Sequence, residues 1–194
     1  MYDFNYKRAT SVDDATASVG SVDEGKFVAG GMTLIPTLKQ RLAQPSDLVD
    51  LGDLKDLVGI TVDASSVTIG AMTPHAVVNA SADVQKAIPA LAKLAGLIGD
   101  PMVRNRGTIG GSISNNDPAA DYPSAVLGLG ATVHTSKREI AGDDFFVGLG
   151  WDCPGSIDLD ASVIMGSQTD GGRVVSTVMF SNKREAGIVH EGDN

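Results

Sequence analysis

The chain has 194 residues, of which 42% are hydrophobic, and its formal net charge at pH 7 is −9. This length and composition suit one large or two small globular domains with a real hydrophobic core. The negative charge argues against nucleic acid as the main partner, because phosphate binding there depends on dense Lys and Arg. If the chain binds an anion, it must do so mainly with backbone N–H groups.

The sequence also limits the membrane segments, disulfides and metal clusters that the chain can contain. No apolar run approaches the roughly 20 residues of a membrane span, so none is expected. The opening residues, MYDFNYKRATSVDDA, lack the basic-then-apolar pattern of a signal peptide, which predicts a cytoplasmic location. Cys153 is the single cysteine, so the chain can form no intrachain disulfide and no all-cysteine metal or iron–sulfur site.

The first fifty residues predict helix, strand, glycine turn, helix and strand, which is an α/β pattern. Residues 11–19 open with a Ser and two acids, as a capped helix does. Residues 26–31 form a short apolar run stopped by two glycines. Residues 33–43 carry apolar side chains at nearly helical spacing despite Pro36, and residues 47–51 predict a strand.

The next section predicts a hairpin followed by helices. Residues 59–63 and 66–71 are two β-rich runs parted by a short polar link. A short helix is expected to follow, with Thr73 as its possible N-cap, and residues 82–99 predict a longer helical region that contains Pro89.

A glycine-rich segment, residues 104–123, then predicts an exposed loop. Residues 123–130 are expected to be helical, and residues 131–136 and 138–142 predict strands. From about residue 147 the pattern changes to short β segments separated by turns, so the tail is expected to be β-rich.

Two glycine-bearing stretches have the composition of ligand-binding loops: AGGMTLIP at 29–36 and RGTIGGSISNNDPAAD at 106–121. Glycine permits φ > 0 and close approach of a ligand, and successive N–H groups in such turns can converge on an anion. The first stretch leads into a predicted helix N-terminus, which favours phosphate. Thr33 and Thr108 could add hydroxyl donors.

An alternative interpretation remains for each stretch. Two glycines before a helix are typical of a tight strand–helix turn, whereas the second stretch is too long for a minimal turn. Neither stretch matches the G-x-x-x-x-G-K-[ST] phosphate loop or the G-x-G-x-x-G dinucleotide motif. Spacing alone therefore indicates an anion or nucleotide loop and nothing more specific.

The two stretches, in this order and at this separation, resemble the FAD-binding medium subunit of molybdenum hydroxylases, the carbon monoxide dehydrogenase and xanthine dehydrogenase family. The resemblance covers about residues 1–146 and includes FNYKRATSVDDA, RLAQPSDLVDL, the T-P-H of 73–75 and REIAGDDFF. It implies an α+β fold of the PCMH type, in which two subdomains, 1–55 (α/β) and 56–146 (α+β), hold the flavin between them.

The resemblance also implies which residues bind FAD. In the first pyrophosphate loop these are Ala29, Gly30, Gly31, Met32 and Thr33. In the second, which would face the first and supply a second wall of amides, they are Thr108, Gly110, Gly111 and Ser112.

Three further positions complete this set. Asp117 and Asp121 match the acidic end of the motif and would accept ribitol or ribose hydroxyls, and Ile98 would pack near the flavin. Asn116 departs from the small residue expected at its position, which leaves its role open.

The family function implied is electron transfer. Electrons leave a molybdenum site on a large subunit, cross iron–sulfur clusters on a small subunit, reach FAD and pass to an external acceptor. This chain would position and tune the flavin. No nucleophile–base–acid set is present, so no catalytic side chain is expected.

The histidines and two arginines have less specific expectations. His75, His134 and His190 are isolated in sequence and are expected to be surface or packing residues. Arg104 and Arg106 flank the second stretch, where either pairing with its acids or the cofactor, or a solvated structural role, is open.

The tail, residues 147–194, has a different resemblance. VGLGWD, DLDAS and HEGDN are similar to motifs of the TerD-type tellurium-resistance family, whose β-sandwich binds calcium. That resemblance implies Asp158, Asp160 and Asp193 as calcium ligands, with solvated surface acids as the alternative. It also supplies the alternative function, a non-enzymatic calcium-binding stress protein.

Overall fold

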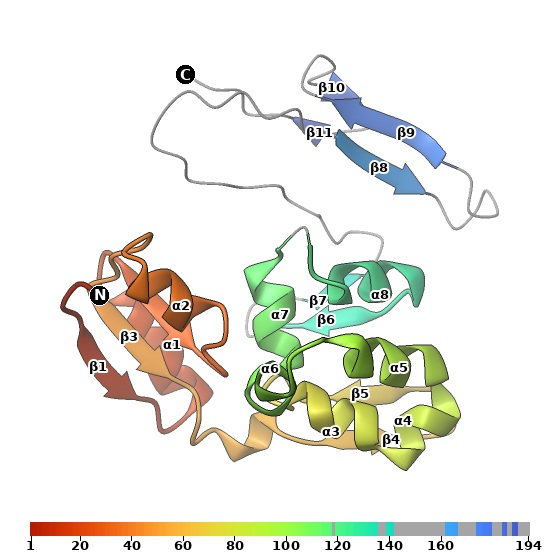
Figure 1. Cartoon of the computed structure of the whole chain (residues 1–194), viewed down its shortest axis with the longest axis horizontal. Coiled ribbons are helices and arrows are strands. Elements are labelled where there is room, and N and C mark those ends of the chain that lie inside the picture. Colours follow the sequence, from red (N-terminus) through yellow and green to blue (C-terminus); the bar gives the residue numbers. More distant parts are fainter. Residues whose placement is uncertain are drawn as a thin grey trace.

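The structure is a computed structural model that describes residues 1–117, 119–135, 139–141, 162–166, 174–179, 184–185 and 188–189. Figure 1 shows two groups of elements side by side: residues 5–50, in red to orange, and residues 60–141, in yellow to cyan. Within these described ranges, no helix has both the length and the apolar character needed to cross a membrane.

The first group is a three-stranded parallel sheet with strand order β1-β3-β2. Helix α1 covers one face, where Ala15 packs with Val49, and α2 covers the other, where Leu38 packs with Leu48. Adjacent residues of a strand point to opposite faces, so β3 supplies the core on both sides. The elements are β1 (Asn5–Arg8), α1 (Val12–Gly20), β2 (Gly25–Val28), α2 (Leu34–Lys39) and β3 (Asp47–Asp50).

Local signals account for most of this group. The Ser11 hydroxyl accepts a hydrogen bond from the Asp14 N–H at 3.0 Å, which confirms the capped helix start. Helix α2 is shorter than expected and is followed by Arg41 in the left-handed conformation (φ 62°). Strand β1 was not predicted, because all four of its residues are exposed and give no apolar pattern.

In its described residues, the second group contains two antiparallel hairpins and six helices. The hairpin of β4 (Ile60–Val62) and β5 (Val67–Ile69) confirms the prediction, and β6 (Thr132–His134) pairs with β7 (Glu139–Ala141). The short 3-10 helix η1 (Lys55–Leu57) joins the groups. The helices are α3 (His75–Ala80), α4 (Ala82–Ala87), α5 (Pro89–Leu97), α6 (Pro101–Arg106), α7 (Ile109–Asn115) and α8 (Tyr122–Gly128).

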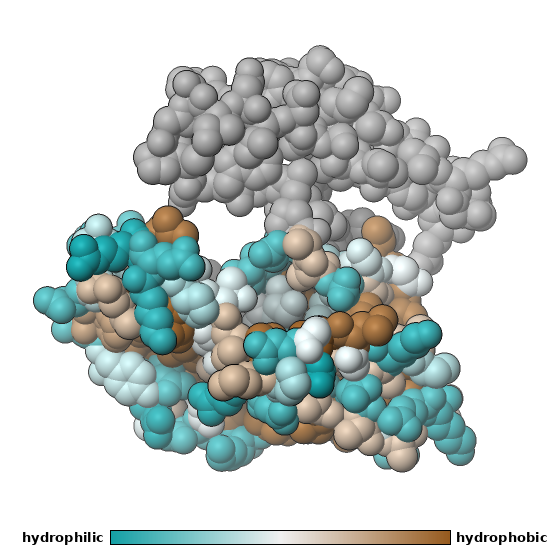
Figure 2. All heavy atoms as spheres, in the orientation of Figure 1, coloured by the Kyte–Doolittle hydropathy of each residue, from teal (hydrophilic) through white to brown (hydrophobic). Residues whose placement is uncertain are grey.

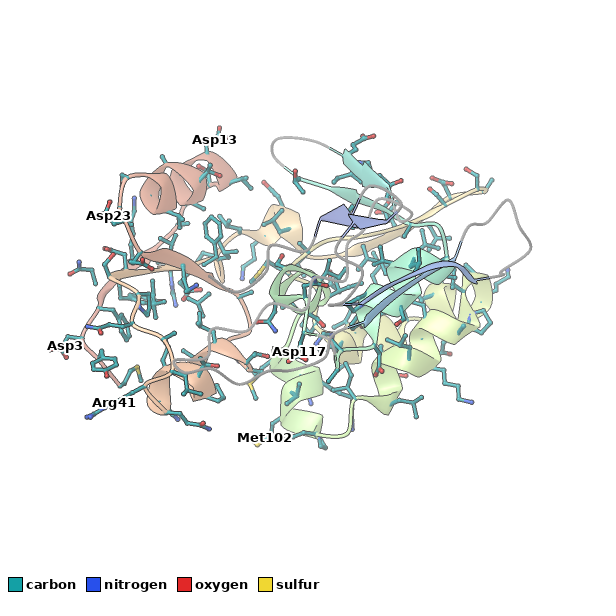
Figure 3. The ribbon with its side chains drawn as sticks, turned by 90° about the horizontal axis from the view of Figure 1, so that it is seen from above. Asp3, Asp13, Asp23, Arg41, Met102 and Asp117 are labelled. Carbon is teal, nitrogen blue, oxygen red and sulfur yellow. The ribbon has the colours of Figure 1, made fainter. Side chains whose placement is uncertain are left out.

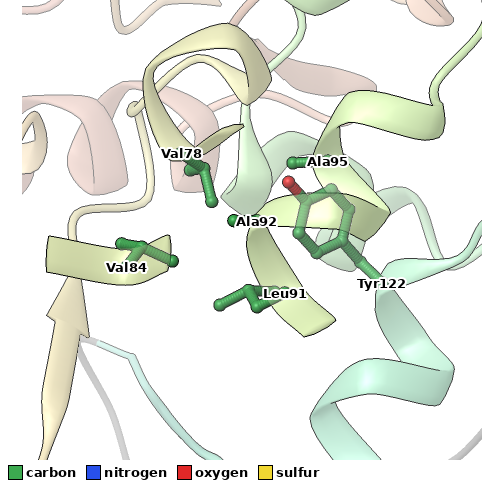
Figure 4. Packing of buried hydrophobic residues seen from close by; sticks show 6 residues of the cluster. All are labelled: Val78, Val84, Leu91, Ala92, Ala95 and Tyr122. Atoms are coloured by element: carbon green, nitrogen blue, oxygen red, sulfur yellow. The ribbon is translucent and has the colours of Figure 1, made fainter. Parts of the chain in front are cut away.

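The core of the second group lies between its helices. Figure 4 shows its buried members, which are Val78, Val84, Leu91, Ala92, Ala95 and Tyr122. The predicted long helical region at 82–99 is divided into α4 and α5, because Pro89 lacks an N–H and instead begins α5. On the face seen in Figure 2, the first group presents mainly hydrophilic residues and the second group a mixture of hydrophilic and hydrophobic ones.

Two local predictions were wrong. Thr73 does not cap α3: Pro74 occupies that position, and the Thr73 hydroxyl accepts a hydrogen bond from the Gly59 N–H at 2.9 Å. The glycine-rich segment is largely helical, since α6 ends at Arg106 and α7 begins at Ile109.

Capping explains how α7 forms from a glycine- and asparagine-rich sequence. The Thr108 hydroxyl accepts from the Gly111 N–H at 3.1 Å at its start. Asn116 ends it in the left-handed region (φ 47°), which Asn adopts more readily than most residues. This backbone conformation explains why Asn occupies position 116, where a small residue was expected.

The described elements of the tail are all strands, as expected. Strand β8 (Ser162–Gly166) pairs antiparallel with β9 (Val174–Met179), and β10 (Arg184–Glu185) pairs with β11 (Ile188–Val189). The subdomain limits at residues 55 and 146 and the TerD-type resemblance of the tail stay predictions.

Candidate functional site

A cavity of about 880 Å³ lies between the two groups of elements. Its lining includes all twelve residues for which the sequence predicted cofactor contacts: 29–33, Ile98, Thr108, 110–112, Asp117 and Asp121. In Figure 3 the labelled Asp117 lies in the middle of the view between the groups, whereas Asp3, Asp13 and Asp23 lie at the outer edge. Residues remote in sequence thus meet at one site of the size typical for ligand pockets.

The first glycine segment, residues 29–33, follows the carboxyl end of β2, the edge of a parallel sheet where ligands commonly bind. Gly31 has φ +73°, which turns the chain toward α2. In the described part of the chain, the N–H groups of residues 29–34 donate to no acceptor, and the Thr33 hydroxyl has no partner. Six successive open donors make this segment suited to an anion.

The second glycine segment, residues 106–112, uses its N–H groups differently. Ile109 donates to the Thr73 carbonyl at 3.1 Å, Gly110 to the Ala71 carbonyl at 2.8 Å, and Ser112 to the Thr108 carbonyl at 3.0 Å. With Gly111 bonded to the Thr108 hydroxyl, these amides are already satisfied inside the chain. The Thr108 N–H, by contrast, donates to no acceptor in the described part of the chain, and the expected second wall of amides stays a prediction.

Gly30 and Gly110 also permit close contacts within the chain. A Cβ on Gly30 would overlap the Arg106 carbonyl oxygen, so only glycine permits the two segments to meet. A Cβ on Gly110 would lie 2.7 Å from the Ala71 carbonyl oxygen, under the normal contact distance. The sequence predicted glycine for ligand approach; the structure shows that close packing of backbone on backbone also requires it.

Charged side chains are few around the cavity. Lys26 is the basic side chain among the lining residues that the structure describes, and Asp117 and Asp121 are the acidic ones. The Asp117 carboxylate accepts from the Ala119 N–H at 2.8 Å. Asp121 stands at the N-cap of α8 without capping it, which leaves its carboxylate available to accept hydroxyl hydrogen bonds.

The arginines flanking the second segment have different positions. The Arg104 guanidinium donates to the Ile98 carbonyl and, at 3.1 Å, to the Gly99 carbonyl. It therefore fixes the turn that places Ile98 on the cavity wall. The Arg106 side chain is exposed and forms no ion pair with any described residue, while its carbonyl contacts Gly30.

His75 is buried and forms a pair with Tyr122. Its Nδ1 lies 3.3 Å from the Tyr122 hydroxyl, and the two rings stack with centroids 5.2 Å apart. Burial lowers the pKa of His75 and raises the pKa of Tyr122. Both residues line the cavity. The packing role expected for His75 fits, but no sequence signal pointed to Tyr122, which is 47 positions away.

His134 is not among the residues that line the cavity. His134 forms an exposed pair with Glu139, Nδ1 to Oε1 at 3.0 Å. His190 and the calcium candidates Asp158, Asp160 and Asp193 lie outside the described residues. Within the described ranges, no group of three or more His, Cys, Asp or Glu side chains could hold a metal ion.

Known proteins match this chain in sequence and in structure. Residues 2–171 match the family model described as the FAD binding domain in molybdopterin dehydrogenase. The carbon monoxide dehydrogenase medium chain of Hydrogenophaga pseudoflava is 40% identical over 152 residues, which is 75% of this chain and 52% of that protein. The nicotine 6-hydroxylase medium subunit of Paenarthrobacter nicotinovorans is 36% identical over 147 residues, 74% and 52% of the two chains.

Solved structures also match this chain in fold and in sequence. Quinoline 2-oxidoreductase from Pseudomonas putida 86 superposes with a TM-score of 0.71 at 33% identity, over 74% of this chain and 52% of that chain. Reconstituted CO dehydrogenase from Oligotropha carboxidovorans gives 0.71 at 36% identity, over 77% and 56%. The chain spans about half the length of the curated relatives it matches. It belongs to the family of FAD-binding domains of molybdopterin dehydrogenases, and its cofactor is FAD.

Proposed function

We propose that this chain is the FAD-binding redox subunit of a molybdenum hydroxylase. It receives electrons from iron–sulfur clusters on a small partner subunit, which in turn is supplied by a large subunit carrying the molybdenum cofactor. The observation that carries the proposal is one cavity lined both by residues 29–34, whose N–H groups have no acceptor in the described part of the chain, and by Asp117 and Asp121.

The residues present fit FAD. A dinucleotide has a dianionic pyrophosphate, and the six open N–H groups of residues 29–34 match that charge without basic side chains. It also has ribose and ribitol hydroxyls, for which the Asp121 and Asp117 carboxylates are suitable acceptors. Apolar lining residues, including Phe27, Leu57 and Ile98, suit flat ring systems.

The division of roles between the two segments follows from their hydrogen bonds. Residues 29–33 would bind the pyrophosphate with their amides, helped by the Thr33 hydroxyl. Residues 108–112 would contribute the Ser112 hydroxyl and the surface shaped by Thr108, Gly110 and Gly111. FAD, when bound, supplies the capacity to take up and release electrons, and the chain fixes its position and excludes water.

The cysteine content of this chain is consistent with the proposed partner subunits. Cys153 is the single cysteine, so the chain cannot supply the thiolate set of an iron–sulfur cluster. In the proposed complex, clusters on another subunit supply the electrons to the flavin. The subdomain division at residue 55 fits this proposal, since the hydrophobic clusters of residues 9–54 and 78–122 are separate and the cavity lies between them.

A calorimetric titration of the purified chain with FAD, FMN and ADP tests the proposal. We expect one FAD per chain, weaker binding of ADP, and the weakest binding of FMN, which lacks the pyrophosphate and the adenosine. Dithionite should then bleach the bound flavin, and a quinone or ferricyanide should restore its colour. Equal affinity for FMN and FAD would contradict the assignment of residues 29–34 to the pyrophosphate.

The alternative, a calcium-binding stress protein, rests on the motif resemblance of the tail alone. A Ca²⁺ titration followed by calorimetry and by thermal melting tests it. Heat of binding together with a raised Tm would support the alternative, and the absence of both would remove it.

A further inference from the structure

The contact between His75 and Tyr122 joins two parts of the cavity wall that come from different helices. His75 begins α3, and Tyr122 begins α8. Their side chains are 4% and 2% exposed, so the hydrogen bond and the ring stack between them are shielded from water. Neither residue belongs to the set of groups proposed above to contact FAD.

On one side, His75 supports the second glycine segment. Its N–H donates to the Gly107 carbonyl at 3.1 Å, and its ring lies against Gly107, where a Cβ would come within 2.8 Å of Nε2. Gly107 directly precedes Thr108, the cap of α7. The Thr73 and Ala71 carbonyls accept hydrogen bonds from the Ile109 and Gly110 N–H groups. Residues 71–75 therefore act as the platform that holds the second glycine segment in place.

On the other side, Tyr122 fixes the start of α8. Its ring is part of the core with Val78, Ala92 and Ala95, as Figure 4 shows. Asp121 precedes it directly and lines the cavity with an exposed, non-capping carboxylate. The position of Asp121 therefore depends on where the Tyr122 ring is held.

His75 has a neutral environment. Burial is the sole cause of its lowered pKa, and no charged group contributes to it. The charged groups on the elements around it are Arg104 and Arg106 on α6, Asp83 and Lys86 on α4, Lys93 on α5, and Asp121 beside Tyr122. A proton added to His75 would be a buried charge without a counter-ion.

We propose that His75 and Tyr122 are positioning residues for FAD: their buried contact holds Gly107 and Asp121 in the places that FAD binding requires. The inference rests on the proposed function. It adds two residues that affect FAD binding through Gly107 and Asp121. Neutral His75 is the binding-competent form, so acidification weakens FAD binding.

The test is the FAD dissociation constant of the 194-residue chain, measured by titrating apoprotein, together with the melting temperature of the apoprotein. Tyr122→Phe keeps the ring and removes the hydroxyl. We expect its Kd to rise roughly fivefold, the change that loss of one neutral hydrogen bond typically causes. Tyr6→Phe is the matched control: it removes a hydroxyl that donates to Asp50, outside the cavity lining. It should lower the melting temperature and leave Kd unchanged.

The pH profile separates positioning from general stability. In the native chain, Kd should rise as pH falls from 7.5 to 5, whereas His75→Gln, which keeps a hydrogen-bond acceptor but does not titrate, should show a flatter profile. An unchanged Kd in Tyr122→Phe, or equal pH slopes in the native chain and His75→Gln, would overturn the inference. Failure of the native chain to bind FAD at any pH would instead overturn the proposed function.

Discussion

Gly30 lies directly against Arg106, so closely that a Cβ on Gly30 would overlap the Arg106 carbonyl oxygen. This contact joins the loop after β2 to the turn between α6 and α7, and thereby brings together the two glycine segments that line the cavity. The geometry of the cavity depends on this contact between backbones.

Replacing Gly30 by Ala should disrupt the cavity. The added methyl group must push the two segments apart, and overpacking of this kind typically costs about 1–3 kcal/mol. We expect FAD affinity to fall roughly tenfold or more and Tm to fall as well. Gly128→Ala is the control, because a Cβ there meets nothing within 4 Å. Native FAD affinity in Gly30→Ala would show that the segments need not touch.

Asp121→Ala should weaken FAD binding without unfolding the chain. The carboxylate caps no helix N–H, so its loss removes no hydrogen bond within the described part of the apoprotein. A lost hydrogen bond to a charged acceptor is worth about 1.5–3 kcal/mol, so Kd should rise roughly tenfold or more. Asp23→Ala, an exposed substitution at the outer edge seen in Figure 3, should leave Kd unchanged. Equal effects of the two variants would argue against a hydroxyl-acceptor role for Asp121.

Arg41→Gly should stabilise the chain. Arg41 has φ 62° and ends α2 with its N–H bonded to the Leu38 carbonyl at 3.1 Å, a position that glycine occupies without strain. Relief of the left-handed conformation is worth about 1 kcal/mol. The Arg41 guanidinium also lies 5.6 Å from the Tyr2 ring centroid, a contact that the variant loses. Arg41→Ala loses that contact and keeps the strain, so urea denaturation should rank glycine above arginine and arginine above alanine.

Acid should destabilise the apoprotein partly through Asp14. Hydrogen bonds from Lys7 and from the Thr10 N–H lower the pKa of Asp14 from 3.8 to about 2. Between these values the unfolded chain binds more protons than the folded chain, so this contribution is complete above about pH 4 and is lost as pH falls toward 2. Denaturation of Asp14→Asn should show a shallower loss over that window than the native chain. Identical slopes would mean that the Lys7–Asp14 contact does not persist in solution.

The sequence predicted elements best where a local signal decides the structure. Ser11 capped a helix as expected, and the short polar link between residues 63 and 66 produced a hairpin. Strand β1 was missed because its pairing with β3 is decided by distant residues and its own side chains are exposed. The helical part of 104–123 was missed because Gly, Ser and Asn disfavour helix interiors, while the Thr108 cap and the platform at 71–75 stabilise α7 in place.

At the site, too, the features that depend on residues distant in the chain could not be predicted from the sequence. Motif order pointed to both glycine segments and both aspartates, and the structure brings them into one cavity. What the sequence did not show is which amides stay open, because that depends on the antiparallel contact of Thr108 with Pro74, far away in the chain. The pairing of His75 with Tyr122 likewise exists only in three dimensions.

Hydrogen–deuterium exchange of the chain with and without FAD tests the central claim most directly. The amides of residues 29–34 have no acceptor among the described residues and should exchange quickly in the apoprotein. Saturating FAD should protect them strongly, with a much smaller gain for residues 109–112, whose amides are already bonded. Protection that FAD confers elsewhere but not on residues 29–34 would contradict the claim that this segment binds the pyrophosphate.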